Sequence, residues 1–325
     1  MDPFASLIGQ DRAIELLAAS YRQGRLASAY LLAGPQGVGR ARAAEAFSAL
    51  LLGGEEAAAR ERALRQVRAG THPDCLWIAP ETGRGQPSIG IERARALTEF
   101  ASRPPLQAPR SVAVIDGAEA LTEAAANALL KTWEEPGRTI PIAIAPSQYA
   151  LLPTLASRCQ CIPFSRLSES DVARVLEQQG HHGVLAQPEV MASAQGRPGA
   201  ALRASACLQA LPAGLLADLR AVPQAGLKQR DAAARAAFER ELLQLAAEAA
   251  SQLEAETQLW LLDALQSSYW QQYLQGQLPH CPLPALVQGR HALQAYAQPR
   301  LAWEVLLLQF GGVLPLQSRV FPSAA

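Results

Sequence analysis

The stretch Gly34-Pro35-Gln36-Gly37-Val38-Gly39-Arg40-Ala41 predicts how the first part of this chain folds. It has the glycine frame of a phosphate-binding loop, whose pattern is GxxxxGK[ST]. A hydrophobic run over residues 29–33 precedes the stretch, and a helix-forming run over residues 41–52 follows it. This order of strand, glycine turn and helix is the context that the motif requires.

Two side chains of the pattern are replaced, because Arg40 stands in the place of Lys and Ala41 in the place of Ser or Thr. The glycines Gly34, Gly37 and Gly39 still allow backbone N–H groups to point at phosphate oxygens. Lysine adds a compact charge at the terminal phosphates, whereas arginine carries a bulkier planar fork. The missing hydroxyl is the group that holds Mg²⁺, and a methyl group has no oxygen. The sequence therefore predicts weak or no nucleotide binding and no efficient hydrolysis by this chain alone.

Composition places the chain among multidomain globular proteins. Its 325 residues are 18% charged and 49% hydrophobic, enough apolar material for two or three domains. The 29 basic and 29 acidic side chains cancel, so overall charge gives no sign of an extended nucleic-acid groove. The first residues lack the pattern of a signal peptide, and no apolar stretch approaches the roughly 18 residues of a membrane span. We expect a cytoplasmic protein without membrane contact.

The five cysteines do not follow a metal-binding pattern. Only Cys159 and Cys161 are near each other, and they form C-x-C rather than the C-x-x-C of common zinc and redox sites. Buried or partly buried free thiols are the favoured interpretation, and no metal is predicted. His72 is interpreted as a turn or capping residue rather than a ligand.

Strands and helices alternate up to about Phe164. The apolar runs at 75–79, 111–115 and 139–145 predict strands, and the patterns over 91–102 and 121–134 predict helices. Such alternation favours a parallel sheet with helices on both faces.

From Ser165 onward nearly every segment has a helical pattern, including the long run 230–262. The apolar positions of that run hold no clean heptad, so a coiled coil has low weight. We predict three parts: a nucleotide-binding-like α/β domain over 1–165, a small helical lid domain over 166–205, and an all-α domain over 206–325.

Several segments, in this order, resemble bacterial DNA polymerase III clamp-loader subunits, which are AAA+ proteins. They are Ile8-Gly9-Gln10, residues 34–40, Thr71-His72-Pro73-Asp74, residues 116–121, Asn127-Ala128-Leu129-Leu130-Lys131-Thr132-Trp133-Glu134-Glu135-Pro136, and Ser157-Arg158-Cys159. The resemblance spans at least residues 6–165, and the N-A-L-L-K-x-x-E-E-P segment with S-R-C is its most specific part. It implies an AAA+ fold, a helical lid and a helical collar that joins five subunits into a ring.

The family contains subunits with and without an intact phosphate loop. The gamma or tau motor keeps it, whereas delta-prime subunits commonly have a damaged loop and keep S-R-C, so Arg40 and Ala41 favour the delta-prime branch. The resemblance implies a stator in the DNA polymerase III holoenzyme that helps load the sliding clamp onto primed DNA. Its implied partners are the gamma/tau and delta subunits, primed DNA and the clamp.

The resemblance also implies roles for single residues. Arg158 would reach the ATP site of a neighbouring motor subunit, with Ser157 and Cys159 shaping its presentation, and ATP and Mg²⁺ would be held by that neighbour rather than by this chain. A guanidinium there stabilises the charge on the transferring phosphoryl group. An arginine paired locally at a strand end is the competing interpretation.

Other positions that serve hydrolysis in the family are altered here. Asp116 and Glu119 occupy the places of the Mg²⁺-binding and water-activating acids, but Gly117 stands where the catalytic glutamate belongs. Asp116 alternatively pairs or caps at the sheet edge. Ser147 is interpreted as a turn serine rather than a phosphate sensor. Gly199 falls in the place of a second sensing arginine, and Arg197 is interpreted as solvated.

Two other functions stay open at this stage. One is a self-sufficient AAA+ ATPase in which Arg40 replaces the lysine, and the other is a switch that binds nucleotide without hydrolysing it. Large aromatics concentrate in the tail, where we expect most to fill the core and a minority to form collar contacts. They are Trp260, Tyr269, Trp270, Tyr273, Tyr296, Trp303 and Phe310.

Overall fold

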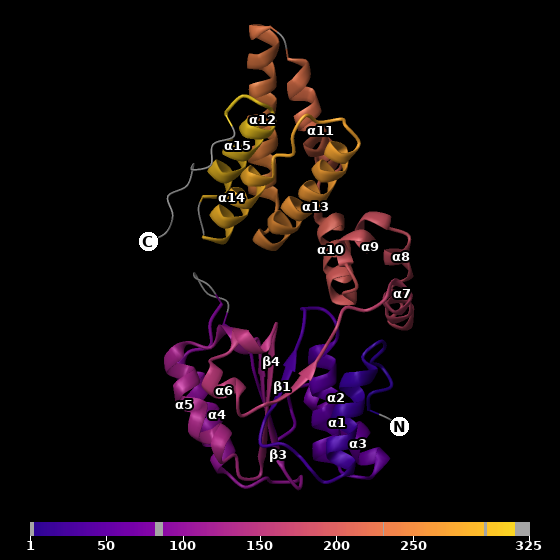
Figure 1. Cartoon of the computed structure of the whole chain (residues 1–325), viewed down its shortest axis with the longest axis vertical. Coiled ribbons are helices and arrows are strands. Elements are labelled where there is room, and N and C mark those ends of the chain that lie inside the picture. Colours follow the sequence, from indigo (N-terminus) through magenta and orange to yellow (C-terminus); the bar gives the residue numbers. More distant parts are fainter. Residues whose placement is uncertain (1–2, 82–86, 230, 296–297, 316–325) are drawn as a thin grey trace. The chain divides into compact units, whose positions relative to one another are not determined.

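Five parallel strands form a single sheet in the order β2-β3-β4-β1-β5 (Figure 1). The structure is a computed structural model that describes residues 3–81, 87–229, 231–295 and 298–315. The strands are β1 (Tyr30–Ala33), β2 (Cys75–Ile78), β3 (Ser111–Asp116), β4 (Thr139–Ala145) and β5 (Gln160–Pro163). β4 is buried along its whole length, as is usual where helices cover both faces of a parallel sheet. The predicted parallel sheet is therefore confirmed.

Helices cover both faces of this sheet (Figure 1). One face carries α1 (Asp11–Arg22), α2 (Arg40–Gly53) and α3 (Ala57–Arg68), and the other carries α4 (Ile91–Ser102) and α5 (Glu123–Glu134). The α4–α5 layer packs Leu97, Leu129 and Trp133 against the sheet as one buried cluster. α4 ends before Arg103-Pro104-Pro105, as predicted, because proline cannot continue a helix and disfavours helical geometry in its predecessor.

A short helix precedes the last strand, and further helices follow it. They are α6 (Pro153–Ala156), just before β5, and then α7 (Glu169–Gln178), α8 (His182–Leu185), α9 (Pro188–Ala194) and α10 (Pro198–Ala210). The side chain of Ser168 caps α7 by accepting a hydrogen bond from the backbone N–H of Asp171. The contacts of the chain divide it between Leu202 and Arg203 into two units. The predicted boundary near residue 165, inside the first unit, stays a prediction.

Helices are the only regular secondary structure among the described residues of the second unit. Its helices are α11 (Leu215–Lys228), α12 (Ala232–Gln252), α13 (Ala255–Leu274), α14 (Leu283–Gln294) and α15 (Pro299–Phe310). The long helical run seen in the sequence is broken at Leu253 and Glu254, between α12 and α13.

Aromatic side chains fill the centre of the second unit. Tyr269 is fully buried, and its hydroxyl donates a hydrogen bond to the carbonyl oxygen of Leu219 at 2.6 Å. The rings of Tyr269 and Phe310 pack edge to face, with their centroids 5.3 Å apart. Trp303 is also buried and donates from Nε1 to Gln258 at 3.0 Å. These partners satisfy the polar atoms that burial would otherwise leave unpaired.

The other tail aromatics divide between partly buried and exposed positions. Trp260 packs against the core, whereas Trp270 and Tyr273 are exposed. Tyr296 lies outside the described residues. The expectation that most of these aromatics are core residues is confirmed for Tyr269, Trp303 and Phe310 and partly for Trp260.

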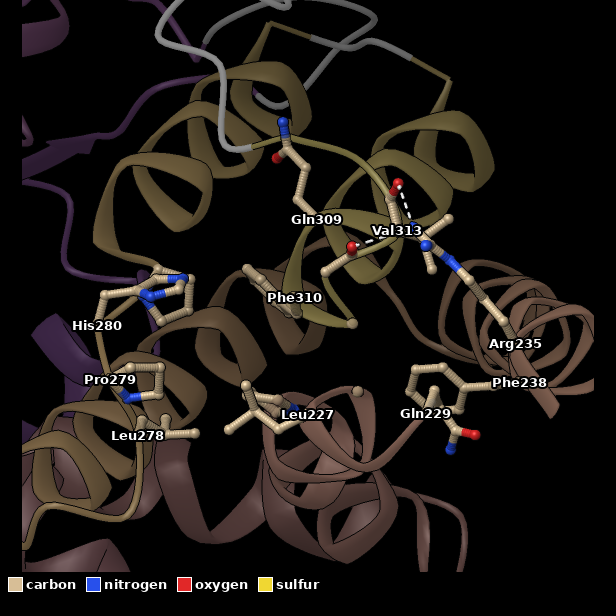
Figure 2. Close-up of a pocket in the computed structure, with 15 residues that line it drawn as sticks. Leu227, Gln229, Arg235, Phe238, Leu278, Pro279, His280, Gln309, Phe310 and Val313 are labelled. Atoms are coloured by element: carbon tan, nitrogen blue, oxygen red, sulfur yellow. Dashed lines mark hydrogen bonds between the residues drawn. The ribbon is translucent and has the colours of Figure 1, made fainter. Parts of the chain in front are cut away.

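A pocket of about 220 Å³ lies in the second unit between α11, α12 and α15 (Figure 2). Its wall includes Leu227, Phe238 and Phe310, and Arg235 lies at its side. The Arg235 guanidinium is directed to the carbonyl oxygens of Gly312 and Val313, at 3.5 and 3.4 Å. The guanidinium of Arg235 is thus engaged by the chain itself.

Among the described residues, no single helix has the length and apolarity needed to cross a membrane. The bent pair α10 and α11 meets that test only when the two helices are taken together.

The Thr71-His72-Pro73-Asp74 segment has a structural role. The buried carboxylate of Asp74 accepts hydrogen bonds from the backbone N–H groups of Leu106, Gln107 and Ala108, at 2.6, 2.8 and 2.8 Å. His72 accepts a hydrogen bond at Nδ1 from the Asp74 N–H, at 3.1 Å, so it belongs to the turn. The segment ties the start of β2 to the loop that leads into β3.

We expect Asp74→Asn to destabilise the first unit. Burial raises the pKa of Asp74, but the three N–H donors and His72 outweigh it, so the pKa of Asp74 is lowered on folding. A carboxylate with a lowered pKa contributes stability at neutral pH and loses it as the pH falls through the folded-state pKa. The variant should lose about 2–3 kcal/mol in urea unfolding at pH 7. The deficit should shrink in acid, and a deficit that does not change with pH would contradict this role.

Candidate functional site

The glycine loop joins β1 to α2 in the way the motif requires. β1 ends at Ala33, and α2 begins at Arg40 after Gly39, whose φ of 105° is favourable only for glycine. Gly37 also has a left-handed φ of 87°. A Cβ atom on Gly34 would lie 2.3 Å from the carbonyl oxygen of Phe164, so no larger residue fits there. The predicted strand, turn and helix are confirmed.

The first turn of α10 contacts this loop through backbone atoms. The N–H of Gly199 donates a hydrogen bond to the carbonyl oxygen of Gly37, at 3.0 Å. A Cβ on Gly199 would lie only 2.9 Å from the Cα of Gly37. Gly199, the position where the family resemblance predicts a sensing arginine, therefore reaches the loop, but as glycine it brings no charge. Arg197 is half-buried and donates from Nε to the carbonyl oxygen of Ala194.

Arg40 is buried at the start of α2, with 8% of its surface exposed. Its Nη1 is buried and has no hydrogen-bond partner among the described residues. Burial lowers the pKa of Arg40, while the negative charges of Glu119 and Asp116 raise it. The guanidinium therefore lies in the field of both acids.

Asp116 and Glu119 lie close together in sequence, at and just after the carboxyl end of β3. Asp116 is the last residue of β3, and Glu119 lies in a short 3₁₀ turn over Ala118–Ala120. Burial raises the pKa of Asp116, and the charge of Arg40 opposes that shift. Arg40 and Asp116 therefore influence each other through their charges, but no hydrogen bond or ion pair joins these two described side chains, so the alternative role of Asp116 as a paired residue stays a prediction.

Gly117, predicted to stand in the place of a catalytic glutamate, lies where a larger side chain is disfavoured. It has a left-handed φ of 77°, and a Cβ there would lie 3.0 Å from Cγ of Pro80. The backbone of a glutamate at this position would be strained in every side-chain conformation.

The residues at this site do not fit the Mg²⁺ of a hydrolysing centre. Ala41 offers no oxygen ligand, and the guanidinium of Arg40 places a positive charge beside the two acids that would otherwise hold a metal. The backbone N–H groups of the loop fit a phosphate, because they do not depend on side chains.

Arg158 lies in the turn between α6 and β5, and its guanidinium is held from two sides. Nη1 donates to the carbonyl oxygen of Thr154, at 2.7 Å, and Nη2 is paired with the carboxylate of Glu134, the last residue of α5. The side chains remain accessible, at 35% exposed for Arg158 and 50% for Glu134. Local pairing of Arg158, left open by the sequence, is therefore what the chain shows.

Ser157 and Cys159 stabilise the turn around Arg158. The Ser157 hydroxyl donates to the carbonyl oxygen of Thr154, at 3.1 Å. The Cys159 sulfur accepts a hydrogen bond from Nε1 of Trp133, at 3.2 Å, and burial raises the pKa of this thiol to about 11. A thiol with such a high pKa is not a nucleophile at neutral pH.

Sheet topology keeps Arg158 away from the glycine loop of its own chain. β1 runs parallel to β5, with Tyr30 opposite Gln160 and Ala33 opposite Pro163. The loop follows the carboxyl end of β1, whereas Arg158 precedes the amino end of β5, where the hydroxyl of Ser28 contacts its carbonyl oxygen. The glycine loop and Arg158 thus lie at opposite ends of the strands, which we call the carboxyl edge and the amino edge of the sheet. Ser147 follows β4 and lies at the same edge as the loop.

All five cysteines are free thiols. Cys207 is buried and Cys75, Cys159 and Cys281 are partly buried, as expected, but Cys161 is exposed because it lies on the edge strand β5. In the part of the chain that the structure describes, no three His, Cys, Asp or Glu side chains are grouped so that they could hold a metal ion.

A parallel five-stranded sheet with a glycine loop after β1, an acid at the end of β3 and helices after β5 defines an AAA+ module, here followed by an all-helical unit. Two protein families match the chain. Residues 9–168 match "DNA polymerase III, delta subunit", and residues 170–310 match "Cyanobacterial DNA polymerase III delta prime, C-terminal domain". The chain belongs to the family of DNA polymerase III delta-prime subunits.

Individual relatives agree with this family. The DNA polymerase III subunit delta' of Bacillus subtilis is 34% identical over 176 residues, 52% of this chain and 52% of that protein. The delta' subunit of Pseudomonas aeruginosa is 40% identical over 138 residues, 41% of this chain and 42% of that protein. The gamma/tau subunit of Mycobacterium tuberculosis is 28% identical over 190 residues, 54% of this chain and 32% of that protein. The matched region spans about half the length of the delta' relatives or less.

Among solved structures, a gamma-subunit-related protein of Thermotoga maritima is similar with a TM-score of 0.48 and 16% identity, covering 91% of this chain and 98% of that chain.

Sequence reasoning missed the partner of Arg158. Glu134 stands in the E-E-P segment that carried the family resemblance, so the motif marked the residue, but its contact spans 24 positions in the chain.

We expect Arg40→Ala to destabilise the first unit by about 1–3 kcal/mol at pH 7, because the partly buried Asp116 loses a compensating charge. Without Arg40, the pKa of Asp116, already raised by burial, rises further. A carboxyl group with a raised pKa becomes neutral as the pH falls, so the deficit should be smaller at pH 5 than at pH 7. Urea unfolding at both values measures it. Arg42→Ala, at an exposed neighbour, is the control, and an equal deficit at both pH values would contradict this electrostatic interaction.

Proposed function

We propose that this chain is the delta-prime subunit of a DNA polymerase III clamp loader. In this role it is a stator that helps load the sliding clamp onto primed DNA and supplies Arg158 to the ATP site of a neighbouring subunit. Membership of the delta-prime family supports the first part. The second part rests on the position of Arg158 at the sheet edge opposite its own glycine loop.

That position carries the proposal. An arginine that contributes to hydrolysis must approach the γ-phosphate, and a nucleotide on this chain's loop would lie at the carboxyl edge of the sheet. β1 alone is four residues long, or about 13 Å, so Arg158 is separated from that edge by the depth of the sheet. A phosphate that Arg158 reaches therefore belongs to another subunit.

The chemistry of such a contact is electrostatic. The transferring phosphoryl group spreads negative charge over its oxygens in the transition state, and an arginine that stabilises this charge contributes about 10³ to 10⁵ in rate. Because the charge comes across an interface, hydrolysis by the neighbour depends on correct assembly.

The chain's own site is proposed not to hydrolyse ATP and to require no cofactor of its own. Ala41 lacks the metal ligand, Gly117 replaces the glutamate, and Arg40 already compensates the acids at the end of β3. Losing one preorganised stabiliser typically lowers rates by about 100- to 1,000-fold, so several such losses leave no efficient turnover. ATP and Mg²⁺ are proposed to bind the neighbouring motor subunit.

The proposed partners are the gamma/tau and delta subunits, which with this chain form a ring of five, together with primed DNA and the sliding clamp. Similarity to a gamma/tau subunit supports the first of these. The helical second unit is proposed as the collar. Contact with DNA is expected to be directed at phosphates and independent of sequence.

A second candidate function is nucleotide binding without hydrolysis. The buried Nη1 of Arg40, unpartnered among the described residues, lies at the N-terminus of α2, where the backbone favours an anion. Calorimetric titration with ATP, with and without Mg²⁺, separates this candidate from a purely structural loop. The motor alternative requires turnover as well as binding.

We expect the purified chain to show no Mg²⁺-dependent ATP turnover above background, because the metal ligand and the glutamate are absent. A coupled phosphate-release assay measures it, with a gamma/tau subunit as positive control. When the chain is mixed with the other loader subunits, native mass measurement should find a discrete five-chain assembly. Brisk turnover that Arg40→Ala abolishes, or a homohexamer, would favour the motor alternative.

We expect Arg158→Ala to lower the DNA-stimulated ATPase of the reconstituted loader by about 10³-fold at the site it serves, with a smaller loss in total rate if other sites remain active. Clamp loading should fall in parallel. Arg158→Lys should restore little, because a point charge cannot reproduce the fork. Arg65→Ala, which removes an arginine from an exposed ion pair on α3, is the matched control. An unchanged rate for Arg158→Ala would refute the role.

A further inference from the structure

The two groups that hold Arg158 come from separate elements. Glu134 ends α5, and Thr154 lies in α6. The two contacts use different nitrogens, Nη2 for Glu134 and Nη1 for the carbonyl oxygen of Thr154. A guanidinium has five N–H donors in a fixed plane, so contacts at two nitrogens define the orientation of the whole fork.

The Glu134 contact is not explained by stability. Both side chains are more than a third exposed, and exposed ion pairs contribute only about 0–1 kcal/mol. The adjacent Glu135 is also exposed, and no ion pair or hydrogen bond of its side chain is found among the described residues. A carboxylate at the end of a helix is also unfavourable, because the helix dipole is negative there.

Orientation is what the contact provides. A free arginine side chain has about 2 kcal/mol of rotamer entropy to lose when it is ordered. The contacts with Glu134 and Thr154 already order the Arg158 side chain, so less rotamer entropy remains to be lost when a partner binds. The three N–H groups not used in these contacts have no partner among the described residues, and they remain available for phosphate oxygens.

We propose that Glu134 is a positioning residue for Arg158. Its carboxylate holds the guanidinium at the amino edge of the sheet in the orientation that the neighbour's phosphate requires. The inference rests on the proposed function, because it concerns the residue that this function assigns to the neighbour's ATP site. It goes beyond that function by naming a side chain that acts only through Arg158.

The test uses the reconstituted loader and its DNA-stimulated ATPase. Glu134→Ala should lower kcat by about 3- to 30-fold, less than Arg158→Ala does, because the charge stays present but is misplaced. KM for ATP should not change, since the neighbour binds its nucleotide without this residue. Glu134→Gln should recover part of kcat, because an amide oxygen still accepts the hydrogen bond. Glu135→Ala is the matched control and should behave as the unaltered subunit.

A double-mutant cycle separates positioning from a structural role. Once Arg158 is alanine, removing Glu134 should lower kcat no further, because Glu134 acts only through Arg158. An equal loss in both backgrounds would overturn the proposal and indicate a structural role. A higher rate for Glu134→Ala would also overturn it, since Glu134 would then restrain the arginine. If Glu134→Ala gives a low yield of assembled complex, Glu134→Gln can be used in its place, because it preserves the side-chain volume. Its kcat is then compared with those of Arg158→Ala and Glu135→Ala.

Failure of the inference is distinguishable from failure of the proposed function. If Arg158→Ala leaves the rate unchanged, the proposed role of Arg158 is refuted. If Arg158→Ala lowers the rate but neither Glu134 variant does, the function stands and the positioning role is overturned.

Discussion

The parallel pairing of β1 with β5 is the constraint on which the rest of the site depends. In a parallel pair, the carboxyl end of one strand and the amino end of the other lie at opposite edges. The register of Tyr30 with Gln160 therefore places the glycine loop at one edge of the sheet and Arg158 at the other. One chain thus carries a loop of phosphate-binding shape at one edge of the sheet and an arginine at the other, too far apart to act on one phosphate.

The same fold explains why the glycines of the loop are present although the lysine and the hydroxyl residue of the motif are not. Gly34 lies against the carbonyl oxygen of Phe164, and Gly37 lies against the backbone of Gly199. Both close approaches belong to packing inside the first unit and involve no ligand. These close approaches favour glycine at both positions, whether or not the lysine and the hydroxyl residue of the motif are present. A glycine frame alone is therefore evidence for a fold rather than for nucleotide chemistry.

Much of the first unit could be predicted from the sequence, because its signals are local. Apolar runs predict β1 to β4, and the prolines after Arg103 predict the end of α4. They do not predict β5, because only one of its four residues, Ile162, is buried. β4 forms despite Pro141, which lies opposite Ala113 in the middle of the sheet, because the surrounding run is wholly buried. The contacts of Asp74 and Glu134 could not be predicted, because each joins residues more than 20 positions apart. A motif shows which residues are present but not which backbone or side chain they meet.

The contacts around Arg158 show how an exposed arginine can be both paired and available. Thr154 and Glu134 occupy two nitrogens of the guanidinium, and about a third of the side chain remains accessible. Trp133, the residue before Glu134, donates to Cys159, the residue after Arg158, so α5 contacts the turn at two successive positions. Because Trp133 is fully buried against the sheet, the end of α5 is fixed in place, and the carboxylate of Glu134 is fixed with it. The orientation of Arg158 is thereby fixed relative to the hydrophobic core of the unit, and this is the rigidity that its proposed role at a neighbouring subunit requires.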